Sequence, residues 1–198
     1  RGSRMGNLTK NKPKSLVKID KEKKLIDKVI ENFENLGFKN ITIITGYKSK
    51  QFENFKNILK IKNEKWKTTN IFGSLMCADK ILSKHKCIIS YADIFYEKEA
   101  IKILKDSNTK KGIIILSYKH WKKYWKQRFK KPLSDLETFK VNKNNLLTEI
   151  GNKTNSYKNI KGQYMGLFKI DPYSWNNIKK NLFKDIKKLD KIDITALF

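Results

Sequence analysis

The sequence predicts an α/β fold in which a mixed, mostly parallel sheet is flanked by helices in three layers, with a small β-insertion. Short β-branched runs alternate with segments of helical periodicity, which is typical of parallel sheets covered by helices. Several of these runs end in glycine or a polar residue, as buried strands do where they lead into loops. At 198 residues and 39% hydrophobic composition, the chain can bury one good core, so we expect a single domain over residues 1–198.

The first half of the chain supplies a strand–helix–strand order. Residues 23–36 carry apolar side chains at spacings of three and four, and Gly37 follows where such a helix would end. The β-branched run 41–45 predicts a buried strand that leads into Gly46. Further helices are expected over 51–59 and 70–81, and a further strand over 86–90.

The second half of the chain is richer in strands. Residues 112–118 are apolar and β-branched and predict a buried strand. Residues 141–149 predict a hairpin that turns at Asn144 and Asn145, and 161–168 predict a strand flanked by glycines. We place the β-insertion at 141–168. An amphipathic, lysine-rich helix is expected over 175–189, and a helix start within 190–198.

The charge of the chain limits its partners. Lys and Arg number 45 against 19 Asp and Glu, a formal net charge of +26. Such an excess is typical of proteins that bind nucleic acid or an acidic membrane surface. The lysines are spread over almost every segment, which favours a solvated surface that attracts an anionic substrate. Nucleic-acid binding remains the alternative from another class of function.

The cysteines and the hydropathy indicate a cytoplasmic protein. Cys77 and Cys87 lie in apolar neighbourhoods without metal-ligand spacing, so we expect ordinary buried thiols. No apolar run approaches the length needed to cross a bilayer, and we expect no signal peptide and no membrane partner.

The start of the chain has the composition of a loop that binds polyphosphate. Glycine lets the backbone approach an anion and turn successive N–H groups inward, while arginine and lysine add positive charge. Pro13 stiffens the segment that presents Lys14. A Gly-Ser-Arg start is also typical of a cloning remnant, but the spacing to Pro13 and Lys14 favours the loop. The residues assigned to nucleotide binding here are Arg1, Gly2, Ser3, Arg4 and Lys14.

The run Gly2-Ser3-Arg4-Met5, followed by Leu8-Thr9 and Pro13-Lys14, resembles the motif of nucleotidyltransferases that activate sugar phosphates and phosphocholine. The resemblance covers nearly the whole chain and implies a Rossmann-like nucleotidyltransferase domain, here without the family's first strand and C-terminal segment. It implies transfer of a nucleoside monophosphate from NTP to a phosphorylated acceptor, with release of pyrophosphate. Arg4 and Lys14 would be catalytic, because they neutralise the triphosphate and the leaving pyrophosphate.

Asp93 is the strongest single candidate for catalysis. It comes just after the apolar strand 86–90, and open α/β sheets bind ligands at the carboxyl ends of their strands. A carboxylate there can hold Mg²⁺ against triphosphate oxygens, whereas the alternative is a cap for a helix near Glu97. The resemblance favours the metal aspartate and implies a second metal carboxylate, for which Asp193 is the candidate in this chain.

Asn70 and Ser74 open the helix expected over 70–81. Both are residue types that cap helices, and capping is the simpler interpretation. The other interpretation is that this helix N-terminus faces the nucleotide. The resemblance to the phosphocholine branch favours nucleotide contacts, and we assign Gly46, in the loop after the preceding strand, to the same site.

The region 120–139 mixes aromatic side chains with Arg and two carboxylates. Trp121, Trp125 and Phe129 recur every four residues, which on a helix gives one stripe for core packing or for a pocket. Aromatics beside carboxylates suit a small cationic head group, while an RNA-stacking surface is the alternative. The acceptor-binding residues assigned are Trp125, Arg128, Asp135, Glu137, Glu149, Gln163 and Tyr164.

The same residues resemble a cytidylyltransferase subgroup associated with capsule and surface-glycan modification. That resemblance implies CTP and a small phosphorylated amine or amino acid as the substrates, with sugar 1-phosphates as the alternative acceptors. Mg²⁺ is the expected cofactor, and a homodimer is a further expectation.

Overall fold

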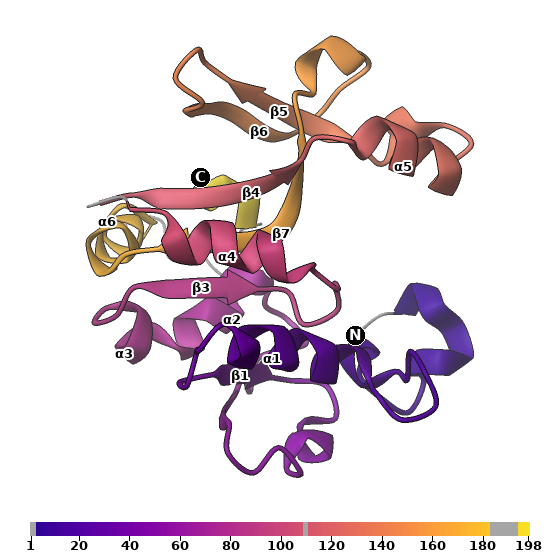
Figure 1. Cartoon of the computed structure of the whole chain (residues 1–198), viewed down its shortest axis with the longest axis vertical. Coiled ribbons are helices and arrows are strands. Elements are labelled where there is room, and N and C mark those ends of the chain that lie inside the picture. Colours follow the sequence, from indigo (N-terminus) through magenta and orange to yellow (C-terminus); the bar gives the residue numbers. More distant parts are fainter. Residues whose placement is uncertain (1–2, 109–110, 183–193) are drawn as a thin grey trace.

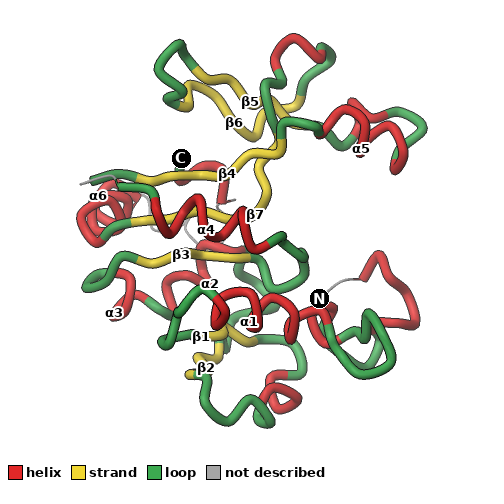
Figure 2. The backbone as a smooth tube through the Cα atoms, in the orientation of Figure 1, coloured by secondary structure: helices red, strands yellow, loops and turns green. Residues whose placement is uncertain are grey.

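The structure is a computed structural model that describes residues 3–108, 111–182 and 194–198 (Figures 1 and 2). In these residues the strands form a parallel pair, β1–β2, a central sheet of order β3-β7-β4, and a hairpin, β5–β6. The strands are β1 (Thr42–Thr45), β2 (Leu59–Lys62), β3 (Cys87–Ser90), β4 (Ile113–Tyr118), β5 (Glu137–Val141), β6 (Leu147–Lys153) and β7 (Gln163–Ile170). The helices are α1 (Leu25–Asn35), α2 (Ile71–Cys77), α3 (Asp79–Leu82), α4 (Lys98–Asp106), α5 (Trp121–Arg128) and α6 (Pro172–Leu182).

Strand β7 lies between β3 and β4 and runs antiparallel to both of them. Phe168 is the partner of Ile89 on one side and of Ile115 on the other. Because both neighbours oppose β7, β3 and β4 point in the same direction. The mixed α/β class is confirmed, although among the described ladders only β1–β2 is parallel.

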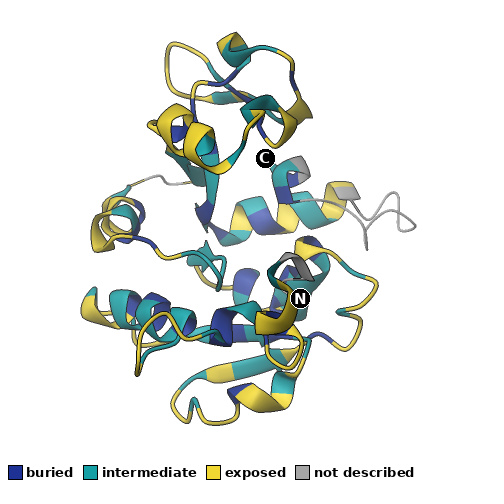
Figure 3. Cartoon of the chain, turned by 90° about the vertical axis from the view of Figure 1, so that its right-hand side faces the viewer, coloured by how far each residue is buried: buried dark blue, intermediate teal, exposed yellow. Residues whose placement is uncertain are grey.

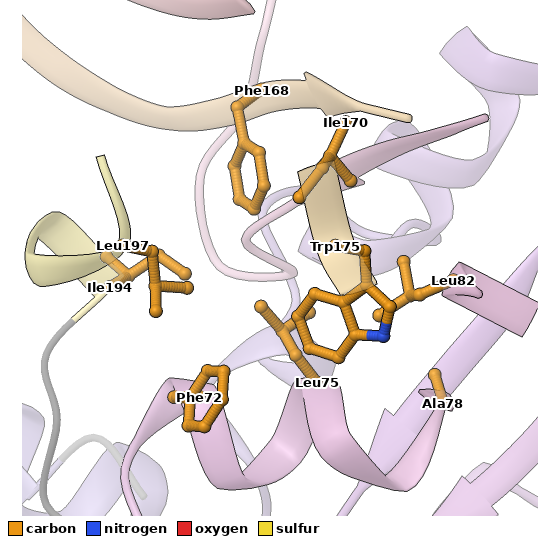
Figure 4. Close-up of a cluster of buried hydrophobic side chains, with 9 residues drawn as sticks. All are labelled: Phe72, Leu75, Ala78, Leu82, Phe168, Ile170, Trp175, Ile194 and Leu197. Carbon is orange, nitrogen blue, oxygen red and sulfur yellow. The ribbon is translucent and has the colours of Figure 1, made fainter. Parts of the chain in front are cut away.

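Helices cover both faces of the central sheet. Phe168 of β7 packs with residues of α2, α3 and α6 on one face, and Figure 4 shows Trp175 at the centre of that cluster. Leu167, its neighbour in the strand, packs with residues of α1 and α4 on the other face. Successive strand residues point to opposite faces, so one strand serves both clusters. The three layers are therefore as predicted.

Most of the predicted elements are confirmed. The helix expected over 23–36 is α1, and Gly37 follows it with a φ of 82°. The helix expected over 70–81 is divided at Ala78 into α2 and α3. The remaining strands and the hairpin lie within a few residues of their predicted positions, and Asn145 in the hairpin turn has a φ of 57°. The expected helix over 175–189 is described only as far as Leu182.

The helix predicted over 51–59 is wrong. A short 3₁₀ turn over Ser49–Phe52 is followed by loop and then by β2, which among the described strands pairs only with β1. The apolar spacing arises because Phe52 and its neighbours Phe55 and Ile58 pack beside Ile43 from a turn. Strand β2 was missed because its alternating lysines, typical of an edge strand, hide the β-pattern.

The β-insertion begins earlier than predicted and ends before β7. It comprises α5, the hairpin β5–β6 and short 3₁₀ turns, and it lies at one end of the molecule (Figure 1). Its own small core contains Trp121, Leu136 and Ile160. Figure 3 shows how much of this region is exposed compared with the helices around the sheet.

Candidate active site

An ion pair joins the basic N-terminal segment to the end of the central sheet. Lys14 Nζ lies 2.8 Å from Asp93 Oδ2, and the two side chains are 37% and 36% exposed. Lys14 begins a 3₁₀ turn directly after Pro13, while Asp93 follows β3 at its carboxyl end. The structure thus brings together two residues that sequence reasoning assigned separately to catalysis.

The segment that carries Asp93 is tied to strand β7. The backbone N–H of Tyr91 donates to the carbonyl of Gly166 at 2.9 Å. The hydroxyl of Tyr96 donates to the carbonyls of Met165 and Gly166, at 2.7 and 3.0 Å. Burial raises the pKa of Tyr96, which keeps the phenol protonated as a donor.

The N-terminal segment forms a 3₁₀ helix over Ser3–Thr9 that is kinked at Gly6, where φ is 52°. This conformation favours glycine. Two side chains from the segment after β1 hold the residues that follow this helix. The Tyr47 hydroxyl donates to the carbonyl of Lys10, and Gln51 Nε2 donates to that of Asn11 at 2.8 Å. Tyr47 and Gln51 were not predicted as site residues. Arg1 and Gly2 lie outside the described residues, and only the backbone of Ser3 and Arg4 is described.

The residues assigned to the nucleoside end lie around the ends of β1 and β2. Buried Asn63, just after β2, donates from Nδ2 to the hydroxyls of Thr69 at 2.8 Å and Ser74 at 3.2 Å. Asn70 occupies the N-cap position of α2, and its carbonyl accepts the Ser74 N–H. Asn63 was missed because β2 itself was missed; an asparagine directly after a strand would have pointed to it.

Gly46 permits a close approach at the same end of β1. A Cβ on Gly46 would lie 2.6 Å from the Cβ of Trp66, which is closer than side chains tolerate. The ring of Trp66 also packs against that of Tyr47, with centroids 5.5 Å apart. The loop after β1 and the loop after β2 are therefore packed directly on each other beside the N-terminal segment.

Three of the predicted acceptor residues lie together in the insertion. Trp125 Nε1 donates to Asp135 Oδ2 at 3.1 Å. The Arg128 guanidinium lies 5.1 to 5.6 Å from the ring centroids of Tyr124, Trp125 and Phe129. Cation–π contact of this kind orients the guanidinium through its flat face and does not itself occupy the N–H groups, which can donate to an anion.

The aromatic stripe expected at Trp121, Trp125 and Phe129 is divided between two roles. Trp121 is 5% exposed and belongs to the small core of the insertion, so this part of the stripe is packing. Phe129 follows α5 in an extended conformation and does not continue the helix. Of these three aromatic residues, only Trp125 remains on the helix as a candidate for ligand contact.

The remaining acceptor candidates lie on the hairpin and on β7. Glu149 pairs with Lys140 at 2.7 Å, and this hydrogen bond lowers the pKa of the Glu149 carboxyl. Gln163 is buried and donates from Nε2 to the carbonyl of Glu137 at 2.8 Å, which ties the insertion to β7. Glu137 itself is exposed.

Tyr164 packs the start of β7 against Tyr91, two residues before Asp93. Its ring packs edge-on against Tyr91, with centroids 6.1 Å apart, and against Phe198. Its hydroxyl is buried and has no hydrogen-bond partner within the described parts of the chain. Burial raises the pKa of this phenol, as does the neighbouring Tyr91 side chain, so the hydroxyl stays protonated.

Asp93 suits a magnesium ion that is shared with a substrate. The described residues contain no cluster of three His, Cys, Asp or Glu side chains, and Asp193 lies outside them. Mg²⁺ in nucleotide sites is commonly held by one or two carboxylates together with phosphate oxygens. A half-exposed carboxylate at a strand end therefore fits such an ion, with the NTP supplying the other ligands.

The fold and this site define a nucleotidyltransferase, an enzyme class that transfers a nucleoside monophosphate. Residues 1–154 match the MobA-like NTP transferase domain, and the chain belongs to that family. No helix in residues 3–108, 111–182 and 194–198 is both long enough and apolar enough to span a membrane.

The relatives include both a curated protein and solved structures. The chain is 38% identical over 177 residues to the CTP:phosphoglutamine cytidylyltransferase of Campylobacter jejuni, covering 85% of this chain and 68% of that protein. It superimposes on the CTP:phosphocholine cytidylyltransferase of Streptococcus pneumoniae with a TM-score of 0.64 at 18% identity, covering 96% of this chain and 75% of the other. For the inositol-1-phosphate CTP transferase of T. maritima the TM-score is 0.68 at 17% identity, covering 96% and 71%. At these identities the two structures support the fold alone.

Proposed function

We propose that this enzyme transfers CMP from CTP to a small phosphorylated amine or amino acid, with release of pyrophosphate, in the synthesis of capsule or surface-glycan precursors. The observation that supports it most directly is the Lys14–Asp93 pair, because it sets a cation of the N-terminal segment beside the strand-end carboxylate. The substrates are proposed from the 38% identity to a CTP:phosphoglutamine cytidylyltransferase. A cytoplasmic location and a homodimer remain part of the proposal.

In this reaction the protein positions the two substrates and supplies charge that stabilises the transition state. An oxygen of the acceptor phosphate attacks the α-phosphorus of CTP in line, a new P–O bond forms, and the bond to the bridging oxygen of pyrophosphate breaks. Mg²⁺, when bound to Asp93 and phosphate oxygens, supplies positive charge to the triphosphate. Asp193 is the proposed second metal carboxylate.

Lys14 changes its partner during this cycle. In the structure its ammonium group neutralises Asp93. With CTP bound, we propose that Lys14 turns to the phosphates, and that Arg4 and the backbone N–H groups from Arg1 to Arg4 do the same. These contacts neutralise the charge that collects on the leaving pyrophosphate.

The nucleotide and the acceptor are held by different parts of the chain. Gly46, Asn70 and Ser74 contact the nucleoside, next to the hydrogen bonds that Asn63 makes. Trp125, Arg128, Asp135, Glu137, Glu149, Gln163 and Tyr164 receive the acceptor. We also propose that residues 1–198 form one domain, which the 96% coverage by structural relatives supports.

The test is a pyrophosphate-release assay with Mg²⁺, each of the four NTPs, and a panel of acceptors. The panel contains phosphoglutamine, phosphocholine, aminoethylphosphonate and hexose 1-phosphates. We expect CTP with an amine-bearing acceptor to give the highest kcat/KM. Preference for hexose 1-phosphates would overturn the proposed acceptor class. No release with any pair, together with salt-sensitive binding of single-stranded nucleic acid, would favour the nucleic-acid alternative.

A further inference from the structure

We propose that Tyr96 and Gly166 are positioning residues that hold the Asp93 carboxylate in place for its metal ion. They do so by tying both ends of residues 91–96, the Asp93 segment, to one point on strand β7. The inference rests on the proposed function, because it takes Asp93 as the metal ligand.

The first end of the Asp93 segment is held by the backbone and by packing. The Tyr91 N–H donates to the Gly166 carbonyl at 2.9 Å, one step beyond the last pair of the β3–β7 ladder, Ser90 with Leu167. Gly166 has a φ of 70°, and a Cβ there would lie 2.6 Å from the Tyr91 ring. Glycine is therefore required twice, for the backbone conformation and for the space under the ring.

The second end is held by a buried side chain. Tyr96 is 2% exposed, and its ring packs in the cluster that contains Ile101 and Leu104. Its hydroxyl reaches the carbonyls of Met165 and Gly166, at 2.7 and 3.0 Å. Its own carbonyl accepts a hydrogen bond from Asn32 Nδ2 of α1 at 2.7 Å. The Tyr96 hydroxyl thus binds the same carbonyl, that of Gly166, to which the Tyr91 N–H donates at the start of the segment.

These contacts determine where Asp93 lies. The Asp93 side chain is half exposed, and its ion pair is with Lys14, which is also half exposed, so neither is held by burial. The position of the carboxylate is set instead by the short backbone loop between the two attachments to β7. Ligand groups must be held to within about 0.5 Å for productive metal and substrate geometry. Loss of either attachment should therefore affect the metal before it affects nucleotide contacts elsewhere.

The variants that test this are Tyr96→Phe and Gly166→Ala. Tyr96→Phe keeps the buried ring and removes only the hydroxyl, whereas Gly166→Ala forces the Tyr91 ring away. Mn²⁺ binding is followed by electron paramagnetic resonance in the presence of a CTP analogue that cannot be cleaved between the α- and β-phosphates. We expect the Mn²⁺ dissociation constant to rise at least fivefold in each variant, and kcat to fall at least tenfold. The KM for CTP should change by less than threefold.

The matched control is Ile101→Val, which loosens the same core cluster but leaves both hydrogen-bonded attachments of the Asp93 segment to β7 intact. If the role of Tyr96 is merely structural, the rise in the Mn²⁺ dissociation constant for a given decrease in Tm should be the same in Tyr96→Phe and in Ile101→Val. The inference is overturned if Tyr96→Phe binds Mn²⁺ within twofold of wild type, or if Ile101→Val weakens the metal equally. It is also overturned if the wild-type protein with the analogue binds no Mn²⁺.

Failure of the proposed function would look different. If wild-type protein binds Mn²⁺ with the analogue and Tyr96→Phe weakens it, but no acceptor yields product, then the assignment of the reaction is wrong and the positioning role stands. If product forms normally in Tyr96→Phe at limiting Mg²⁺, the reaction stands and the positioning role is wrong.

Discussion

Lys14 and Asp93 form an ion pair of 2.8 Å between the start of the chain and the end of β3. More than a third of each side chain is exposed. Ion pairs in such surroundings contribute about 0 to 1 kcal/mol to stability. Substitutions at either position should therefore report on ligand binding and catalysis and leave folding nearly unchanged.

Asp93→Asn should abolish most turnover while the protein keeps its Tm to within a few degrees. The amide conserves volume but removes the negative charge that a hard cation requires. Turnover is measured by pyrophosphate release at limiting Mg²⁺. The control is Asp106→Asn, an equal change at the exposed end of α4. Wild-type turnover in Asp93→Asn would remove this residue from the metal site.

Lys14→Ala should raise the KM for the NTP or lower kcat by at least tenfold, which corresponds to about 1.4 kcal/mol. The variant loses the cation that we place on the triphosphate. Lys12→Ala is the matched control, because Lys12 is exposed and lies two residues before Lys14. The two substitutions change the net charge of the protein by the same amount. If both variants behave alike, the effect is one of overall charge and Lys14 has no specific role.

Asp135→Asn should raise the KM for an amine-bearing acceptor severalfold and leave the KM for CTP within about twofold. An asparagine oxygen can still accept the hydrogen bond from Trp125 Nε1, so the insertion keeps its geometry while the charge is lost. Steady-state kinetics with each substrate varied in turn separates the two constants. An equal rise in both would place Asp135 in a structural role.

Asp171 should account for part of the decrease in the free energy of unfolding at low pH. Burial alone would raise the pKa of this carboxyl, but hydrogen bonds from the N–H groups of Ser174 and Gly112 outweigh it and hold the pKa below the ordinary value. In the unfolded chain an aspartate has a pKa of about 3.9. Because the pKa of Asp171 is lower in the folded protein, its ionised form stabilises the fold at pH values above the unfolded pKa. This stabilisation is lost as the pH falls through the folded pKa.

The free energy of unfolding should therefore decrease below about pH 4, and the decrease should be less steep in Asp171→Asn. At neutral pH that variant should be less stable by about 1 to 2 kcal/mol. Urea unfolding at a series of pH values measures both effects. Identical slopes for the variant and the wild type would mean that other carboxylates, such as Asp79, account for the acid sensitivity.

The fold class could be predicted from the sequence because its central strands and long helices have strong periodicity. The helix α1 has one apolar face, and the apolar runs of β3 and β4 are bounded by polar residues. Strand β2 could not be predicted, because it is short and alternates lysines with its two apolar residues. Where β7 would pair was equally hidden, since register depends on tertiary contacts between distant residues.

The charged residues of the candidate site could be proposed from the sequence, whereas the residues that hold those side chains in place could not. Lys14 and Asp93 belong to chemically distinctive local patterns. Tyr96 and Tyr47 act through hydrogen bonds to backbone carbonyls far along the chain, and Asn63 acts through hydrogen bonds to two hydroxyl groups. A tyrosine or asparagine of this kind has no local pattern, so only the three-dimensional structure identifies it.

Among the described strands, β7 comes last along the chain and occupies the middle of the central sheet. On the ribosome, β3 and β4 emerge first, and the edges that will receive β7 stay unpaired while the whole insertion is being added. Unpaired strand edges invite association with other chains, and such long-range pairing is slow to form. Translation through the insertion is therefore the interval in which this protein most needs protection from aggregation, and a pause or premature stop there would prolong it.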